Sequence, residues 1–146
     1  MNFSHEISAV FDCSLERAFK APILGDATKF MKGYLFQPPV TGFEDDQTWG
    51  EINGIRYPIN DGNLFVNSGR MFKDVILERR ENKYWKWTIY DFEFNTLFFI
   101  QKAIGEWEVK NLNENKGGAI ANLKKDFTDI WKCILGQSTR EGFLRV

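Results

Sequence analysis

Histidine and cysteine are scarce in this chain, and their scarcity excludes several kinds of site. The sequence contains one histidine, His5, and two cysteines, Cys13 and Cys133. No two of these residues have the spacing of a structural zinc site, so we predict no metal and no other cofactor. The two thiols are expected to stay reduced, as is usual in a cytoplasmic protein.

Long apolar runs and an excess of basic residues are also missing. No run approaches the ~18 apolar residues of a membrane-spanning helix, and the opening MNFSHEIS lacks the basic and apolar parts of a signal peptide. The formal net charge is −1, from 19 basic and 20 acidic residues. This balance gives no electrostatic basis for binding nucleic acid. We therefore expect a cytoplasmic protein without a membrane span.

Recognisable catalytic motifs are absent as well. No Gly-x-Ser-x-Gly sequence surrounds a serine, and no glycine-rich phosphate loop is present. Ser14, Ser138 and Thr139 are predicted to cap helices rather than to act as nucleophiles. The sequence contains no set of residues that identifies an enzyme.

Aromatic residues, in contrast, are abundant. They make up 16% of the 146 residues, with 14 phenylalanines and 5 tryptophans. Many of them lie between Tyr84 and Val109, in what we predict to be two neighbouring strands. The length fits a single domain, residues 1–146, that is large enough to bury one core.

The first part of the chain predicts a strand followed by two helices. Polar and apolar residues alternate from Asn2 to Phe11, which is typical of a half-buried strand. Asp12 or Ser14 is expected to cap a helix that ends at Pro22. A second, short helix is predicted from Ala27 to Lys32.

The rest of the chain predicts six strands joined by turns, and then a helix. The expected strands are 40–44, 49–59, 64–80, 84–92, 97–112 and 119–127, with an interruption at 67–69 and a turn at 113–118. The sheet is expected to bend at glycines 50, 54, 69 and 105. The last helix either starts at Ser138 or runs back through a kink at Gly136 to Thr128.

This order of elements resembles that of a known superfamily. Together with Trp49-Gly50, Gly54-Ile55-Arg56, Asp61-Gly62 and Gly105-Glu106-Trp107, it is similar to the helix-grip (SRPBCC) superfamily of Bet v 1-like, START and polyketide cyclase proteins, and to its bacterial-type members. The resemblance covers nearly the whole chain. It implies an α+β fold in which a curved seven-stranded antiparallel sheet wraps around a C-terminal helix and encloses a cavity. It also implies an apolar ligand, such as a lipid, hormone or polyketide, while a minority of members catalyse reactions.

A ten-stranded fatty-acid-binding fold is the main alternative, because it also places two helices after its first strand. It needs three more strands than this sequence predicts, and it does not end in a capped helix. The helix-grip fold is therefore the one we predict.

Three residues are candidates for acid–base chemistry. His5 either points into the cavity or lies at its rim. Arg56 either binds an oxygen of a ligand or pairs with a carboxylate on the neighbouring strand. Glu106 is expected to face solvent, because Trp107 and Val109 of the same strand are easier to bury, unless a bend at Gly105 reverses the two faces.

The aromatic side chains of the central strands are predicted to line the cavity. The expected ligand-binding residues are Trp49, Arg56, Trp85, Trp87, Tyr90, Phe99, Trp107 and Trp131. Such a lining favours binding or transport of a hydrophobic or aromatic small molecule. The alternatives are a cyclase- or dehydratase-type enzyme acting on a bound substrate, and a protein-interaction module without a ligand. In the second case the partner could be another copy of the chain, which would form a homodimer.

Overall fold

An antiparallel sheet with one α-helix packed on it forms the part of the chain that the structure describes. The computed structural model describes residues 2–29, 31–33, 38–64, 66–93, 101–113 and 116–128. The predicted C-terminal helix lies outside these residues. The strands are β1 (Asn2–Phe11), β2 (Gly42–Asp45), β3 (Ile55–Asn60), β4 (Gly69–Arg70), β5 (Lys73–Arg80), β6 (Tyr84–Tyr90), β7 (Lys102–Asn113) and β8 (Lys116–Thr128). The helix α1 (Leu15–Leu24) and the 3-10 turn η1 (Ala27–Lys29) follow β1.

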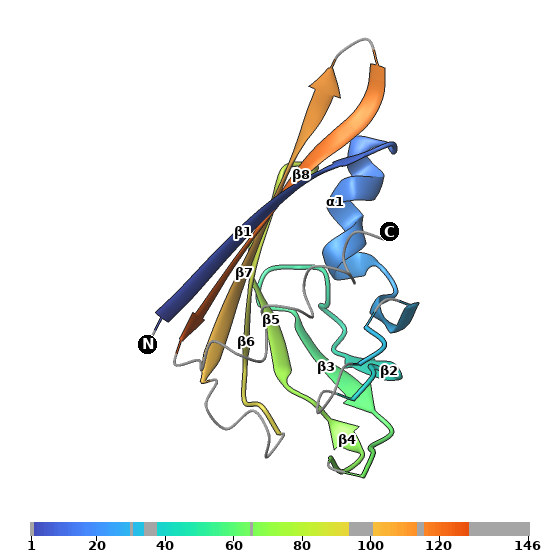
Figure 1. Cartoon of the computed structure of the whole chain (residues 1–146), viewed down its shortest axis with the longest axis vertical. Coiled ribbons are helices and arrows are strands. Elements are labelled where there is room, and N and C mark those ends of the chain that lie inside the picture. Colours follow the sequence, from blue (N-terminus) through green and yellow to red (C-terminus); the bar gives the residue numbers. More distant parts are fainter. Residues whose placement is uncertain are drawn as a thin grey trace.

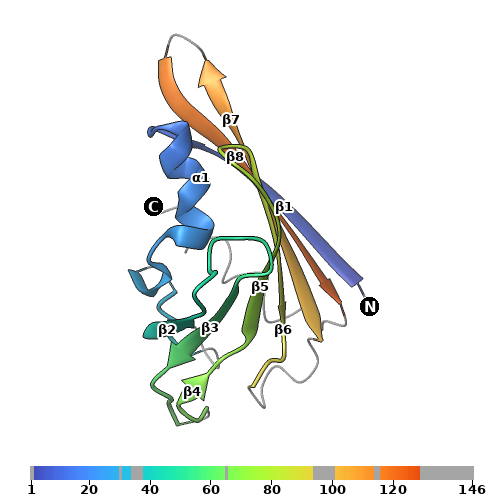
Figure 2. The ribbon, with the colours of Figure 1, turned by 180° about the vertical axis from the view of Figure 1, so that it is seen from behind.

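The strands form one open sheet. Their order is β1-β8-β7-β6-β5-β3-β2, with β4 paired to β3 beside β5. β4 and β5 both pair with β3, so they occupy the place of one interrupted strand, and the sheet is the predicted seven strands wide. The sheet curves toward the side on which α1 lies (Figures 1 and 2). It does not close on itself, and the ten-stranded alternative is therefore wrong.

The two faces of the sheet differ in chemistry. The inner face, which we define as the one that packs against α1, holds Trp85 and Trp87 of β6 and Trp107 and Val109 of β7, all 6% exposed or less. The side chains between them point to the outer face, where Lys86 pairs with Glu106 at 3.1 Å. This confirms the prediction that Trp107 and Val109 point to the buried face of their strand and Glu106 to the other face.

The two predicted helices differ from the expectation. Ser14 caps α1 by accepting a hydrogen bond from the Arg17 N–H, but α1 continues past Pro22 to Leu24. The predicted end at Pro22 is wrong. This proline lies in the last turn of α1 and lacks the N–H that would bond to the Ala18 carbonyl, but that carbonyl has another hydrogen-bond donor. The second helix is a single 3-10 turn, capped by the Asp26 carboxylate through the Thr28 N–H at 3.1 Å.

The predicted strand at 49–59 is too long. Residues 46–54 form turns in which the Asp46 carboxylate accepts the Thr48 N–H at 2.9 Å, and β3 starts only at Ile55. Gly54 is required there, since a Cβ atom would lie 2.3 Å from the Thr48 carbonyl oxygen. Two other turns also shift: Gly69 lies in β4 rather than in the interruption, and the glycines at 117 and 118 lie within β8.

Gly105 has a different role from the predicted bend. β7 continues through it from Lys102 to Asn113. A Cβ atom at position 105 would lie 2.3 Å from the ring of Trp87, its partner on β6. The glycine therefore makes room for an indole that lies across the neighbouring strand.

Candidate functional site

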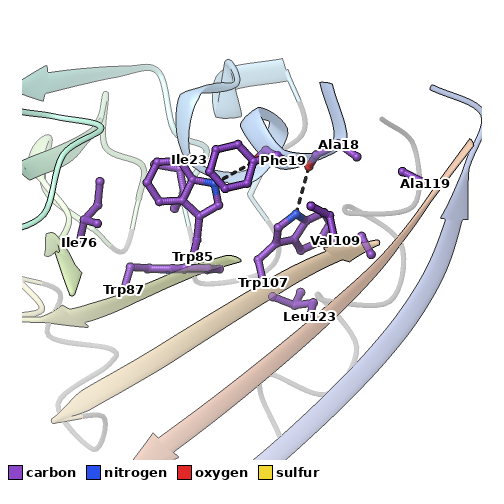
Figure 3. Packing of buried hydrophobic residues seen from close by; sticks show 11 residues of the cluster. Ala18, Phe19, Ile23, Ile76, Trp85, Trp87, Trp107, Val109, Ala119 and Leu123 are labelled. Atoms are coloured by element: carbon purple, nitrogen blue, oxygen red, sulfur yellow. Dashed lines mark hydrogen bonds between the residues drawn. The ribbon is translucent and has the colours of Figure 1, made fainter. Parts of the chain in front are cut away.

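Three tryptophans on different elements hold α1 against the sheet. Trp85 donates its indole N–H to the Phe19 carbonyl at 2.8 Å, and Trp107 donates to the Ala18 carbonyl at 3.0 Å (Figure 3). Trp49, in the turn before β3, donates to the Ile23 carbonyl at 3.2 Å. Buried indoles usually find such a polar partner. These rings are therefore structural contacts of α1 as well as parts of an aromatic wall.

The inner face carries two apolar clusters. The first lies under α1 and includes Phe19, stacked on Trp85 with ring centroids 4.7 Å apart. The second lies beyond the end of α1 and is formed by Val40, Val66, Met71 and Phe72. Its margin is only half-buried, and consists of Met31, Phe43, Ile89 and Phe92. Ile89 packs against both clusters and joins them.

A row of charged residues crosses the sheet beside this margin. Asp45 of β2, Arg56 of β3 and Asp74 of β5 are partners in register, and Ile89 of β6 is the next residue in the row. Arg56 forms a bidentate pair with Asp45, with nitrogen–oxygen distances of 2.6 and 2.7 Å. Of the two alternatives considered for Arg56, the structure therefore shows the cross-strand ion pair.

The guanidinium of Arg56 is also enclosed. Its carbon lies 4.2 Å from the ring centroid of Phe43 and 4.4 Å from that of Trp49, and Nη1 donates to the Ile23 carbonyl at 3.2 Å. Only 11% of the side chain is exposed. Arg56 thus ties β3 to β2 and to the last turn of α1.

Asp74 differs from its neighbours because part of its carboxyl group lacks a partner. Among the residues that the structure describes, its Oδ1 atom is shut off from solvent and accepts no hydrogen bond. Burial raises the pKa of Asp74 to about 7, although the positive charge of Arg56 acts in the opposite direction and the charge of Asp45 adds to the rise. Near neutral pH, this carboxyl group is divided between its neutral and ionised forms.

The candidate catalytic residues do not come together. His5 lies on β1, in register with Lys125, on the strand face that includes Ile7 and Phe11. Phe11 contacts Trp107 at 6.2 Å between ring centroids, so this is the inner face. Four strands separate β1 from Arg56 on β3, and Glu106 lies on the outer face. No acid–base pair is formed among these three residues.

The predicted ligand-binding residues are divided in the same way. Trp85, Trp87 and Trp107 lie on the inner face and are buried. Trp49 and Arg56 are only partly buried. The side chain of Tyr90 points to the opposite face from those of Trp87 and Ile89. On that outer face, the Lys73 Nζ atom lies 5.4 Å from the centroid of the Tyr90 ring. Its predicted place in the cavity is wrong because successive side chains of a strand point to opposite faces, and that of Tyr90 points outward. Phe99 and Trp131 lie outside the described residues.

A separate hollow of about 720 Å³ follows the flank of α1. It is lined by residues between positions 11 and 29 and by Trp107. It lies away from the charged row, none of whose members lines it.

Two features were sought in the described ranges: a cluster of metal-ligating side chains and a long apolar helix. Within them, no group of three His, Cys, Asp or Glu residues is placed to hold a metal ion. None of the described helices has the length and apolar character needed to cross a membrane.

Comparison with known proteins shows the fold. No family model and no curated protein sequence matches the chain. A solved structure that does match is that of Ara h 8.0201, a Bet v 1 family allergen, with a TM-score of 0.66 over 92% of this chain and 82% of that one. This chain has the Bet v 1-like helix-grip fold. The sequence identity is 14%, so the likeness is one of fold alone.

Proposed function

We propose that this chain binds a hydrophobic or aromatic small molecule on the inner face of its sheet. The observation that carries the proposal is the half-buried apolar margin of the second cluster, in a helix-grip fold. Under α1 the rings are packed, and Trp85 and Phe19 have no exposed surface. At the margin, Phe43, Ile89 and Phe92 keep part of their surface. Apolar surface of this kind, with a few polar groups beside it, is typical of ligand sites.

Titration with a neutral apolar dye tests this proposal. Nile red should bind at one site per chain, and 2-ethylnaphthalene should displace it. Ile89→Ala should weaken dye binding several-fold, because Ile89 joins the two clusters. Ile104→Ala is the matched control, since Ile104 lies on the neighbouring strand with its side chain on the opposite face. Absence of saturable binding, or equal loss in both variants, would overturn the proposal.

The two alternatives considered from the sequence are less well supported. An enzyme of the cyclase or dehydratase type needs polar groups that converge, but His5, Arg56 and Glu106 are far apart in the sheet order or on different faces. A protein-interaction module would need an aromatic surface that is free for a partner, and the outer face of β6 carries two tyrosines, Tyr84 and Tyr90. The Arg80 guanidinium lies 4.4 Å from the ring centroid of Tyr84 and the Lys73 ammonium lies 5.4 Å from that of Tyr90, so both half-buried rings already contact a cation of their own chain.

A further inference from the structure

Asp74 lies at the junction of the two apolar clusters. In the sequence it stands between Phe72 of the second cluster, just before β5, and Ile76 of the first cluster, within β5. Its cross-strand neighbour Ile89 packs against both. A carboxyl group is an unexpected residue for such a position, because buried polar atoms are almost always hydrogen-bonded. The unpaired Oδ1 of Asp74 therefore marks a place where a partner is missing.

Arg56 is the nearest cation, but it is already engaged. Two of its nitrogens hold the Asp45 carboxylate, and Nη1 holds the Ile23 carbonyl. A turn toward Asp74 would break a bidentate pair and leave Asp45 without it. The charged groups that act on Asp74 are Arg56 of β3 and Asp45 of β2, while its neighbour on β6 is apolar. Burial favours the neutral form of Asp74 more strongly than the charge of Arg56 opposes it, and the charge of Asp45 adds to the effect of burial.

A neutral carboxyl group can donate a hydrogen bond through its O–H, which an ionised one cannot. In an apolar site this donor binds an acceptor oxygen well, because water does not compete there. We propose that Asp74 is the polar anchor of the ligand site and that the ligand carries an uncharged acceptor oxygen, such as that of a ketone. This inference rests on the proposed binding function and specifies the chemical class of the ligand.

Other ligand charges fit the site less well. A carboxylate ligand would add a second negative charge next to that of Asp45. An ammonium ligand would lose its hydration next to the Arg56 guanidinium. A ketone requires neither, and its carbonyl oxygen satisfies the donor while its apolar part contacts Ile89 and Phe92.

Two probes that differ only in the acceptor test the inference. 2-Acetylnaphthalene and 2-ethylnaphthalene have nearly the same size, but only the first has a carbonyl oxygen. Each is measured by displacement of Nile red from the full chain. At about pH 5.5, where Asp74 is protonated, the ketone should bind about tenfold more tightly than the hydrocarbon. At about pH 8.5 this preference should disappear, because the ionised carboxylate has no O–H.

Variants of Asp74 separate the anchor from a general effect on folding. Asp74→Asn keeps a donor at every pH, so it should retain the ketone preference and lose the pH dependence. Asp74→Leu should bind both probes equally. Asp126→Asn, on the outer face of β8, should behave as the unmodified chain. Circular dichroism shows whether each variant is folded.

The two proposals fail in different ways. If the chain binds the hydrocarbon, but the ketone has no advantage at either pH, Asp74 is not the anchor and the binding function stands. If neither probe displaces the dye, both proposals are overturned.

Discussion

The indole nitrogen of Trp107 lies 3.0 Å from the carbonyl oxygen of Ala18 and donates a hydrogen bond to it. Ala18 is the residue whose helical donor would be position 22, and that position is a proline without an N–H. A side chain from β7 therefore supplies the donor that α1 lacks. Trp85 donates a second hydrogen bond from the sheet to α1, at the next carbonyl, that of Phe19. The proline thus keeps its place inside the helix because the sheet satisfies the carbonyl that it exposes.

Removing this indole donor should destabilise the chain, and removing Pro22 should relieve part of the loss. Trp107→Phe leaves the Ala18 carbonyl buried without a donor, which costs about 1–3 kcal/mol. In the Pro22→Ala background, residue 22 regains an N–H that can bond to Ala18. The cost of Trp107→Phe should therefore be about 1 kcal/mol smaller there, as measured by urea unfolding of all four chains. Simple additivity of the two substitutions would contradict this account.

Gly105 offers a second test of how closely the inner face is packed. Gly105→Ala places a methyl group 2.3 Å from the Trp87 ring, so the ring must move, at a cost of about 1–3 kcal/mol. Gly42→Ala is the matched control, because its Cβ meets no atom within 4 Å, and it should change stability by less than about 0.5 kcal/mol. Thermal and urea unfolding measure both. Equal effects at the two glycines would show that the Trp87 contact is unimportant.

Local patterns were sufficient to predict most of the sheet. The alternation in β1 and the direction of Trp107 and Val109 follow from residues that are neighbours in sequence, since a strand has a period of two. The pairing of Arg56 with a carboxylate was one of two alternatives that the sequence left open, and the sequence did not identify Asp45. The register between β2 and β3 decides that choice, and register depends on the whole sheet.

The central feature of the site was not predicted for a related reason. Asp74 is followed by Val75, Ile76 and Leu77, so apolar residues occur at both parities and the pattern does not give the direction of the carboxylate. The continuation of α1 past Pro22 depends on Trp107, which is remote in sequence. Contacts between distant residues override local preference in both cases.

Two arginines of the same chemistry allow the effect of burial on an ion pair to be measured. Arg56 pairs with Asp45 and Arg70 pairs with Glu44, each from β3 or β4 to β2, and each lies over an aromatic ring. The side chain of Arg56 is 11% exposed and that of Arg70 is 47% exposed. Arg56→Lys should cost about 1.5–3 kcal/mol, since it loses the bidentate geometry and the bond to Ile23. Arg70→Lys should cost clearly less than Arg56→Lys, because exposed ion pairs contribute little to stability. Urea unfolding that ranks the two in the opposite order would contradict this assignment.

Asp74 should make the folded chain less stable as the pH rises toward neutrality. Its pKa is raised by burial from 3.8 to about 7. Between these values the folded chain keeps a proton that the unfolded chain has lost, so unfolding releases a proton and a rise in pH favours unfolding. Asp74→Asn removes this effect. The free energy of unfolding of Asp74→Asn, relative to that of the unmodified chain, should therefore rise by about 1.4 kcal/mol for each pH unit between about pH 5 and about pH 7. Between about pH 7 and about pH 8 the difference should level off.

The matched control for this pH dependence is Asp126→Asn. Hydrogen bonds from Ser4 and then Lys124 lower the pKa of Asp126. The stability that its ionised form contributes is thus already complete above the unfolded pKa and is lost only at lower pH. Its difference from the unmodified chain should stay constant between about pH 5 and about pH 8. Urea unfolding at several pH values measures both variants, and a constant difference for Asp74→Asn as well would show that the Asp74 carboxyl group is not held neutral by its surroundings.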